Sequence, residues 1–517
     1  MFDSMGDETF NRFHEILFWP LELSAKQPLD ADTIENWIKD NNDGKPWHKI
    51  DPYDRGTTQS AELRYAEFVY FHPFVRRFLY PSGEGTQHLT ILARDDIRGV
   101  HVRLRYGSFE GNLRVNRVHL YLFQTHVAIL VVEVESAEPL SRVAAMALLE
   151  EFRKVYAPSW EKGKSVKCPE QVQWLDEGGK LLGPPSTFLE FDLQRKRVET
   201  ASWRRPPVSA HWSWLLSGLS ASCPSEERKK GCLYFDQIGD ERIPAMCFLT
   251  TAAPHQISPG DLQRLCFYDE ATEKSSDSTY SPLFLKDFAE RHCYDRYWDN
   301  ENKDNLWMST RYLCSGYGFT ILGCTNSDFV NDEDSGLLAF FRHHYFQLGL
   351  IAHFHRASLL QFSRRFSESV QRETERGEGL NRDFARFVTG YWFNEVSNQM
   401  QGSELFQFWT GHLGNQKLLE HVMREKRLAV ELDEATKIKE DGKQVRELTQ
   451  QLEVLTLLLV PLTLAGVAVA WLDMEFTRSH IAWLKDTSFW WIVGCGVPAI
   501  VAVSYFLSKL LKKKDKS

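Results

Sequence analysis

Short apolar runs that alternate with polar residues dominate the first half of the chain and predict β-strands. Within residues 61–160 the clearest runs are LTILARD, VHVRLRYG and RVHLYLFQTHVAILVVEVES, which are rich in β-branched and aromatic side chains. The stretch that follows, SRVAAMALLEEFRKVYAPSW, starts with a serine, spaces its apolar residues as a helix does and ends near a proline. Strands followed by a helix predict an α/β subdomain over these residues.

Residues 161–335 repeat this pattern more weakly. The runs TFLEFDL, PAMCFLTTA and GFTILGCTN predict strands between long irregular loops, and we expect a second, β-rich α/β subdomain here. Residues 1–60 contain the turn-forming sequences DNNDGKPW and DPYDRG, so an irregular or helical N-terminal cap is expected.

From residue 336 onward the apolar positions recur at helical spacing. The run that begins LLAFFRHHYF predicts one long helix that stops at the two glycines of GEG, residues 377–379. A second helical stretch starts at Leu380 and is expected to break near Gly411 and Gly414, because glycine favours the end of a helix.

The helix predicted after that break is long and leads into apolar sequence. Residues 418–472 would measure roughly 80 Å as one helix, so we expect long helices over residues 336–453 to form a stalk. The segment 454–472 holds no charged residue, and the segment 489–508 reads FWWIVGCGVPAIVAVSYFLS. Each can cross a hydrocarbon core of about 30 Å, so both are predicted transmembrane helices.

The flanking charges predict the orientation of these helices. Residues 509–517 form a basic tail with five lysines, Lys509, Lys512, Lys513, Lys514 and Lys516, which favours the cytosolic side. Residues 473–488 then form a short external loop. The N-terminus lacks the basic start and apolar run of a signal peptide. We expect a multi-pass protein of the plasma (inner) membrane with both termini in the cytosol.

Small and apolar residues recur every seven positions from the stalk into the first membrane segment. One heptad position is small or hydroxylated: Ala435, Gly442, Thr449, Thr456 and Thr463. The position three residues later is apolar or small: Ile438, Val445, Leu452, Leu459 and Gly466. In the stalk, charged residues flank both positions, which is typical of parallel helices around a common axis. The residues predicted to line a pore are Thr449, Leu452, Thr456, Leu459, Thr463 and Gly466.

Two other interpretations of this heptad seam stay open. A threonine hydroxyl in a helix commonly bonds a carbonyl of the preceding turn, which requires no pore. A leucine stripe shares another face and would pack helices together while the threonines point into neighbours: Leu448, Leu452, Leu455, Leu459 and Leu462.

The outer end of the seam carries a proline and two acids. Pro461 removes one backbone hydrogen bond and predicts a kink, where freed carbonyls could face water. Asp473 continues the register past the membrane segment, with Glu475 beside it. In several copies these carboxylates would form a ring that concentrates cations at the outer mouth. The alternative is a solvated loop.

The C-terminal part of the chain resembles the CorA family of divalent-cation channels. The resemblance rests on a very long helix entering the first of two membrane helices, the string VPLTLAG at residues 460–466, a short acidic outer loop and a lysine-rich tail. It implies a homopentamer, with a cytoplasmic α/β domain on a helical funnel and a pore lined by the first membrane helix. It places pore layers at Thr449, Leu452, Thr456 and Thr463.

One hallmark of that family is absent. In the family, a Gly-Met-Asn tripeptide ends the first membrane helix, and its asparagine ring holds a hydrated magnesium ion. The aligned positions here are Ala470, Trp471 and Leu472. The resemblance therefore implies a divalent cation, Mg²⁺ or another, without implying magnesium selectivity, and no covalently bound cofactor is expected.

Composition and motifs restrict the remaining possibilities. The net charge of −9 makes the protein a poor nucleic-acid binder. The nine cysteines form no C-x-x-C pair, so neither a zinc finger nor a disulfide framework is expected. The sequence has no Walker motif, Gly-rich phosphate loop or nucleophile elbow, so an enzyme is not indicated.

Aromatic residues are concentrated between residues 294 and 319. Trp298, Trp307 and Tyr312, with arginines nearby, could stack a planar ligand such as a nucleotide. The alternative is that these rings belong to a hydrophobic core.

Four histidines occur on one predicted helix: His343, His344, His353 and His355. His344 and His355 share a face, but along a helix they are about 16 Å apart, too far to hold one metal ion. We expect core or surface histidines and no zinc site.

The leading hypothesis is a homo-oligomeric, pentameric cation channel or transporter of the CorA type, gated by its cytosolic domain. Its partners would be other copies of itself, the lipid bilayer, the transported cation and a small-molecule regulator. The alternative is a ligand-gated signalling or defence effector. There, the enlarged cytosolic domain senses a small molecule, and the membrane domain perturbs the membrane or anchors to it.

Overall fold

The structure is a computed structural model that describes residues 9–25, 47–51, 61–80, 89–155, 168–187, 208–216, 233–239, 241–272, 278, 280–298, 307–372, 377–476, 498, 502 and 505. The chain divides into two compact units, Met1–Lys426 and Arg427–Ser517.

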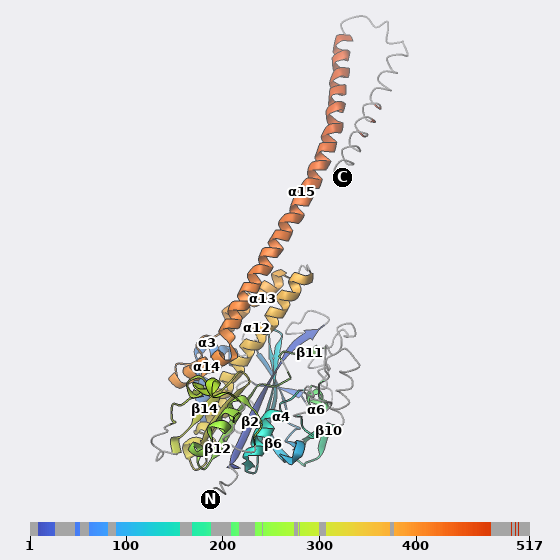
Figure 1. The fold of residues 1–517 in the computed structure, drawn as a ribbon. Coiled ribbons are helices and arrows are strands. Elements are labelled where there is room, and N and C mark those ends of the chain that lie inside the picture. Colours follow the sequence, from blue (N-terminus) through green and yellow to red (C-terminus); the bar gives the residue numbers. More distant parts are fainter. Residues whose placement is uncertain are drawn as a thin grey trace. The chain divides into compact units, whose positions relative to one another are not determined.

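One large mixed sheet runs through the first unit (Figure 1). Among the described residues it has 13 strands, with the order β10-β9-β5-β6-β7-β2-β12-β15-β14-β13, while β11 pairs with β2 and β3 joins through β4 to β6. The strands of this sheet are β2 (Arg12–Ala25), β3 (Trp47–Ile50), β4 (Leu89–Arg94), β5 (Gly99–Arg103), β6 (Glu110–Phe123), β7 (Val127–Ser136), β9 (Gln171–Leu175), β10 (Leu181–Thr187), β11 (Leu233–Gln237), β12 (Ala245–Thr251), β13 (Cys293–Tyr294), β14 (Arg311–Cys314) and β15 (Gly318–Cys324). A separate pair joins β1 (Thr9–Phe10) to β8 (Leu140–Ser141).

Strand β2 is the centre of this sheet. It pairs with β7 from His14 to Glu22 and with β12 from Arg12 to Leu17, both antiparallel. Strand β2 therefore joins the strands of the two predicted α/β subdomains into one sheet. The expected N-terminal cap is wrong for this segment. The sequence RFHEILFWPLELSA lacks a clean alternation because helices cover both faces of β2, so apolar side chains point both ways.

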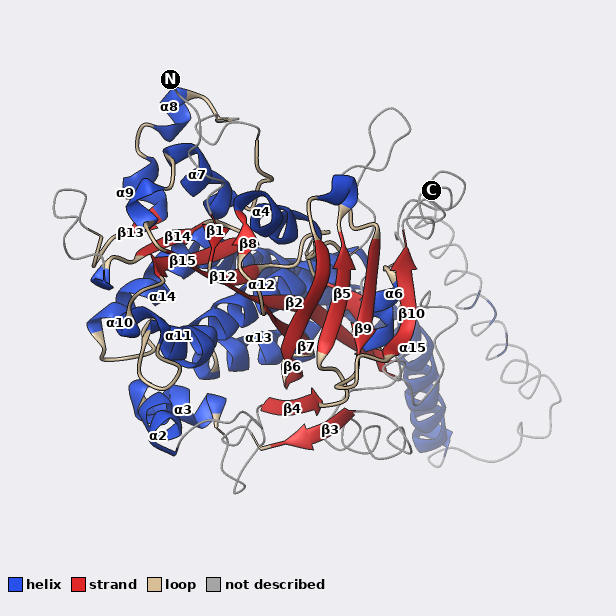
Figure 2. Ribbon diagram, turned by 90° about the horizontal axis from the view of Figure 1, so that it is seen from below, coloured by secondary structure: helices blue, strands red, loops and turns tan. Residues whose placement is uncertain are grey.

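Helices cover the two faces of the sheet (Figure 2). On one face, α4 (Arg142–Glu151), α6 (Ala210–Leu215) and α7 (Pro259–Phe267) share a core with Leu17 and Trp19 of β2. The serine predicted to start a helix does so, since the Ser141 hydroxyl accepts a hydrogen bond from the amide of Ala144.

On the other face, α12 (Phe346–Arg372) packs against β2 and β7, and α14 (Met400–Leu413) packs against α12. Phe18 of β2 stacks on Phe346 at 5.6 Å between ring centroids. Gly349 allows α12 to approach α14 closely, because a Cβ at this position would lie 2.4 Å from the Trp409 ring. Helices α2 (Ala61–Tyr70), α3 (Pro73–Leu79), α10 (Asp328–Asn331), α11 (Leu337–Phe340) and α13 (Gly377–Gly390) lie nearby, and α8 (Pro282–Leu285) and α9 (Phe288–His292) precede β13.

The helical region differs from the expected stalk. A π-helical turn, Phe341–Tyr345, interrupts the first predicted helix, and the glycines expected to end that helix instead begin α13. The predicted break at Gly414 is confirmed: its φ of 66° ends α14, and α15 begins at the next residue. Residues 336–426 belong to the first unit, so the stalk cannot start at residue 336.

Helix α15 (Asn415–Phe476) contains 62 residues and continues through Pro461. Its part within the second unit holds a stretch long and apolar enough to cross a membrane, and none of that stretch is buried. The chain thus has an α/β sheet domain followed by a long C-terminal helix, as predicted. The predicted second membrane segment (489–508) and the tail (509–517) lie outside the described residues, apart from three isolated positions.

Candidate functional site

The predicted pore-lining residues lie on the exposed part of α15. The hydroxyls of Thr449, Thr456 and Thr463 donate hydrogen bonds to the carbonyls of the residues four positions earlier, at 2.7, 2.7 and 2.9 Å. Each hydroxyl oxygen keeps acceptor capacity for water or a cation. The other predicted residues are also exposed: Leu452 is 63% exposed, Leu459 is 51% exposed and Gly466 is exposed.

The rival leucine stripe is exposed to the same degree. Leu448, Leu455 and Leu462 are 58%, 53% and 55% exposed. The part of the chain that the structure describes therefore leaves both stripes uncovered, and both the pore and the packing interpretations stay open.

The positions at the outer end of the seam fall within α15. Ala470, Trp471 and Leu472 are helical, and the helix continues past Asp473 and Glu475 to Phe476. The two acids therefore occupy helical backbone, not a loop as the predicted boundary at residue 473 implied. The rest of the predicted external loop lies outside the described residues.

The predicted aromatic ligand site is not assembled as one group. The ring of Trp298 lies 4.0 Å from that of His255, and the ring of Trp307 lies 6.1 Å from that of Phe329. Tyr312 is buried, and its hydroxyl accepts a hydrogen bond from Gln401 at 3.0 Å. Each of the three residues packs against different neighbours, and Tyr312 belongs to the core, as the alternative interpretation holds.

The four histidines His343, His344, His353 and His355 are all buried. Burial lowers the pKa of His353 to about 3 and that of His355 to about 4, so both are neutral at pH 7. His343 Nδ1 lies 3.5 Å from Glu67 Oε2 of α2. The sequence has no carboxylate three or four residues from His343, so this contact could not be predicted from helical spacing. Among the described residues, no group of three or more His, Cys, Asp or Glu side chains is arranged to hold a metal ion.

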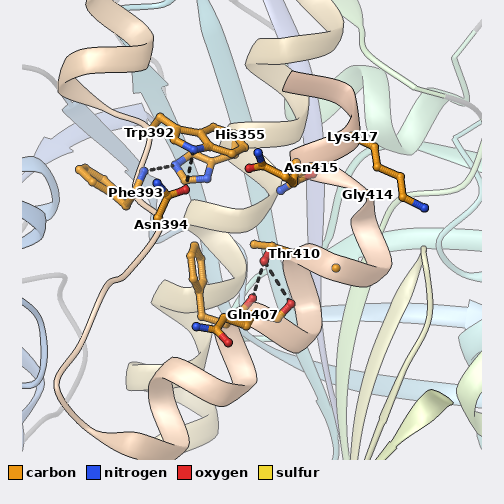
Figure 3. Close-up of a pocket in the computed structure, with 12 residues that line it drawn as sticks. His355, Trp392, Phe393, Asn394, Gln407, Thr410, Gly414, Asn415 and Lys417 are labelled. Atoms are coloured by element: carbon orange, nitrogen blue, oxygen red, sulfur yellow. Dashed lines mark hydrogen bonds between the residues drawn. The ribbon is translucent and has the colours of Figure 1, made fainter. Parts of the chain in front are cut away.

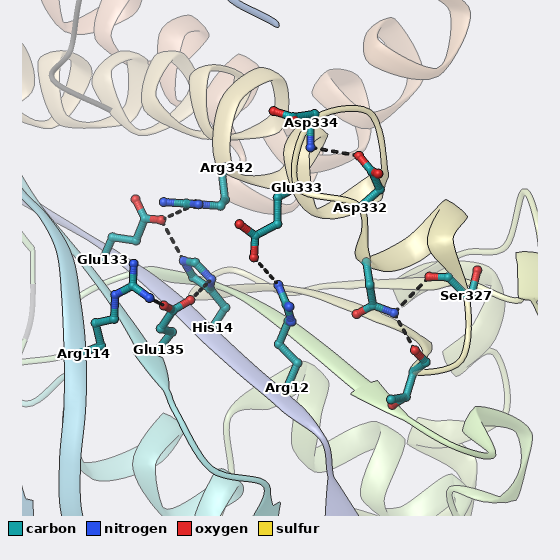
Figure 4. Close-up of polar contacts among 12 residues, drawn as sticks. Arg12, His14, Arg114, Glu133, Glu135, Ser327, Asp332, Glu333, Asp334 and Arg342 are labelled. Carbon is teal, nitrogen blue, oxygen red and sulfur yellow. Dashed lines mark hydrogen bonds and ion pairs between the residues drawn. The ribbon is translucent and has the colours of Figure 1, made fainter. Parts of the chain in front are cut away.

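A buried charged network that sequence analysis missed joins β2, β6, β7 and the π-helical turn (Figure 4). His14 Nε2 and Arg342 Nε approach Glu133 Oε1 at 2.7 and 2.8 Å, while Arg117 Nη2 lies 2.7 Å from Glu133 Oε2. Glu135 Oε2 lies 3.3 Å from His14 Nδ1. Because Arg342 belongs to the π-helical turn, the network fastens the start of α12 to the sheet.

The electrostatics of the network favour ionised carboxylates. Burial opposes ionisation of Glu133, but the guanidinium groups of Arg117 and Arg342 and the hydrogen bond from His14 hold its pKa well below the usual range. Burial also opposes ionisation of Glu135, yet the hydrogen bond and charge of His14 and the charge of Arg114 lower its pKa to about 2. Both carboxylates of the network therefore lie against histidine and arginine groups that favour their charged form.

Comparisons with protein-family models, with curated proteins and with solved structures found no match for this chain.

Proposed function

We propose that the protein is a homo-oligomeric membrane channel or transporter for cations, pentameric and CorA-like, whose α/β unit lies in the cytosol and gates the pore. The observation that carries the proposal is the surface of α15. Its apolar residues and its three threonines, spaced seven residues apart, are exposed along the same helix, and none of its apolar stretch is buried by the described residues.

Exposed apolar surface on this scale favours association. Fully burying one leucine side chain contributes about 1.5–3 kcal/mol, so a helix with many exposed leucines gains by meeting other helices or lipid. A seven-residue repeat directs one edge of the helix toward parallel copies. The remaining apolar surface then faces acyl chains.

Hydroxyl groups on the inner edge of such a bundle would give a polar path. Thr456 and Thr463 carry no charge, and their oxygens can replace part of the hydration of a passing cation. Asp473 and Glu475, repeated around the axis, would attract cations to the outer mouth. Because Ala470, Trp471 and Leu472 replace the family's polar tripeptide, we expect no strict magnesium selectivity.

A second candidate function is a ligand-gated effector of signalling or defence. It is favoured by a cavity at the first turn of α15, lined by His355, Asn415 and Lys417 among others. In this function, flux or membrane disturbance would appear only after a small molecule binds the first unit.

Flux measurements on the full chain in proteoliposomes test the proposal. We expect selective uptake of cations, and Thr456→Leu should reduce the flux at least about tenfold, equivalent to about 1.4 kcal/mol of barrier, because a hydroxyl ring is lost. Thr436→Leu is the matched control: Thr436 is also exposed on α15, and its hydroxyl donates to the carbonyl of Leu432 at 2.8 Å, but it lies outside the seam and the apolar stretch.

Particle size in detergent should be the same for wild type and both variants. No flux of any cation, or equal flux in wild type and Thr456→Leu, would overturn the channel. Flux that requires an added cytosolic ligand would favour the effector.

A further inference from the structure

A cavity of about 250 Å³ lies where α12, the turn after α13, α14 and the first turn of α15 meet (Figure 3). All its lining residues belong to the first unit, among them His355 of α12, Trp392, Phe406 of α14, and Asn415 and Lys417 of α15. This lining contains one lysine and no acidic residue. Its charge therefore favours a neutral or negative ligand.

The first turn of α15 supplies hydrogen-bond donors to one side of the cavity. The amide of Leu418 donates to the carbonyl of Gly414 at 3.0 Å, the first backbone hydrogen bond of the helix. The amides of the three preceding residues have no acceptor within an α-helix. The N-terminus of a long helix also carries a partial positive charge, which attracts anions.

Two buried acceptors lack a partner on the same cavity wall. His355 is fully buried and neutral, and its Nε2 lies 2.8 Å from the carbonyl oxygen of Tyr391. Nε2 also lies 3.4 Å from the amide nitrogen of Phe393. Because two lone pairs repel each other at 2.8 Å, the shorter contact to Tyr391 places the proton on Nε2, which leaves Nδ1 as an acceptor with no hydrogen bond. Asn415 is 1% exposed, and its Nδ2 donates to the carbonyl of Ala352 at 2.9 Å, while its Oδ1 has no partner.

These unpaired acceptors point to a bound molecule. Leaving a buried polar atom without a hydrogen bond costs about 1–3 kcal/mol, so a ligand with N–H groups would recover that free energy. Trp392, which stacks on His355 at 4.5 Å, and the buried rings of Phe393 and Phe406 provide an apolar surface beside the acceptors.

We propose that this cavity binds a small organic anion that also carries N–H donors. Its carboxylate or phosphate would meet the first-turn amides of α15, with Lys417 at the rim. Its N–H groups would donate to His355 Nδ1 and Asn415 Oδ1. A free amino acid and an aminopurine mononucleotide share this chemistry. Binding of such a ligand does not depend on the channel, but its role as the regulator of the pore rests on the proposed function.

Calorimetric titration of the full chain in detergent tests the site with L-glutamine, adenosine 5′-monophosphate and, as an anion without N–H donors, inorganic phosphate. We expect one of the first two to bind saturably, with one molecule per chain, and phosphate to bind at least about tenfold more weakly, a difference of about 1.4 kcal/mol. Which of the two binds distinguishes the amino acid from the nucleotide.

Two variants should weaken binding at least about tenfold without unfolding the protein. Gly411→Leu fills the cavity, and a Cβ at Gly411 meets no atom within 4 Å. Lys417→Glu reverses the charge at the rim, while an acid in the first turn of a helix stabilises the helix. The matched controls are Gly379→Leu, a helical glycine of α13 with equally open surroundings, and Lys439→Glu on the exposed part of α15.

A dissociation constant weaker than about 1 mM for both donor-bearing probes overturns the site, as does equal binding by wild type, Gly411→Leu and Lys417→Glu. Binding is measured independently of flux. If the protein binds a probe but transports no cation, the cavity is a binding site and the proposed channel is wrong. If the protein transports cations but binds neither probe, the proposed channel stands and the proposed binding site is wrong.

Discussion

The two units bury the same kinds of side chain to opposite extents. In the first unit, Leu17 and Phe18 on β2 are 0% exposed, because helices cover both faces of the sheet. In the second unit, Leu464 and Val467 on α15 are each 64% exposed. The first unit completes its hydrophobic core within one chain, whereas no other described residues cover the apolar surface of α15.

The polar groups follow the same division. Glu133, a buried carboxylate of the first unit, is paired with groups from other strands and from the π-helical turn. The threonine hydroxyls of α15 are satisfied within their own helix and stay exposed. Contacts between distant segments thus pair this buried charge, while α15 carries a pattern that repeats every seven residues and is satisfied within the helix.

Removal of residues 427–517 should have the largest effect, because it leaves the first unit with its buried core and removes the exposed apolar surface of α15. We expect the remaining chain to be monomeric and soluble without detergent and to keep its secondary structure, since its core lies within the first unit. Light scattering after size-exclusion chromatography and circular dichroism check this result. An oligomer of unchanged stoichiometry would instead place the main assembly contact on the first unit.

Loss of one carboxylate from the buried network should be the next largest effect. Glu133→Leu leaves the charges of Arg117 and Arg342 without their partner, which costs about 3–5 kcal/mol of the free energy of unfolding. Urea denaturation at pH 7 measures the change. Glu138→Leu, at an exposed position just after β7, is the control and should change stability by less than about 0.5 kcal/mol.

The pH dependence of the same variant gives a second test. The folded-state pKa of Glu133 lies below its unfolded value, so its stabilising contribution is present above the unfolded pKa of about 4.5 and is lost as pH falls through the folded value. The difference between wild type and Glu133→Leu should therefore shrink in acid. A constant difference between pH 7 and pH 3 would show that lost packing, not lost charge, destabilises the variant.

Local sequence patterns predicted the elements whose signal is local. The β6–β7 hairpin follows from the alternation in RVHLYLFQTHVAILVVEVES, and the start of α15 follows from Gly414. The central strand β2 was missed because its two buried faces remove the alternation that marks an ordinary strand. The strand is identified only by its pairing with β7 and β12, which are distant from it in the sequence.

The charged network and the cavity depend on residues that are distant in the sequence. Glu133 and Glu135 gave one local signal, since two acids alternate with valines in a buried strand. Their partners His14 and Arg342 come from opposite ends of the first unit, so no spacing rule connects them. The cavity likewise requires His355 and Asn415 to meet across two helices.

The smallest expected effect concerns a carboxylate that the first unit buries without a hydrogen-bond partner. Glu15 neighbours the network on β2, but both its oxygens lack a hydrogen bond in the described structure. Burial raises its pKa to about 8, against the opposing charge of Arg153. The folded-state pKa of Glu15 exceeds its unfolded value. The folded wild type therefore keeps its full stability below about pH 4.5 and loses stability as the pH rises toward 8.

Glu15→Gln removes this titration and keeps the size of the side chain. Relative to wild type, the variant should gain stability as the pH rises from 4.5 to 8, because its unfolded chain has no carboxyl group at this position to release a proton. Urea denaturation at both pH values measures the gain, with Glu138→Gln as the exposed control. A gain that is equal at both pH values would mean that Glu15 is ionised in the folded protein. Arg153 would then pair with Glu15 as Arg117 and Arg342 pair with Glu133, and both buried carboxylates would be ionised.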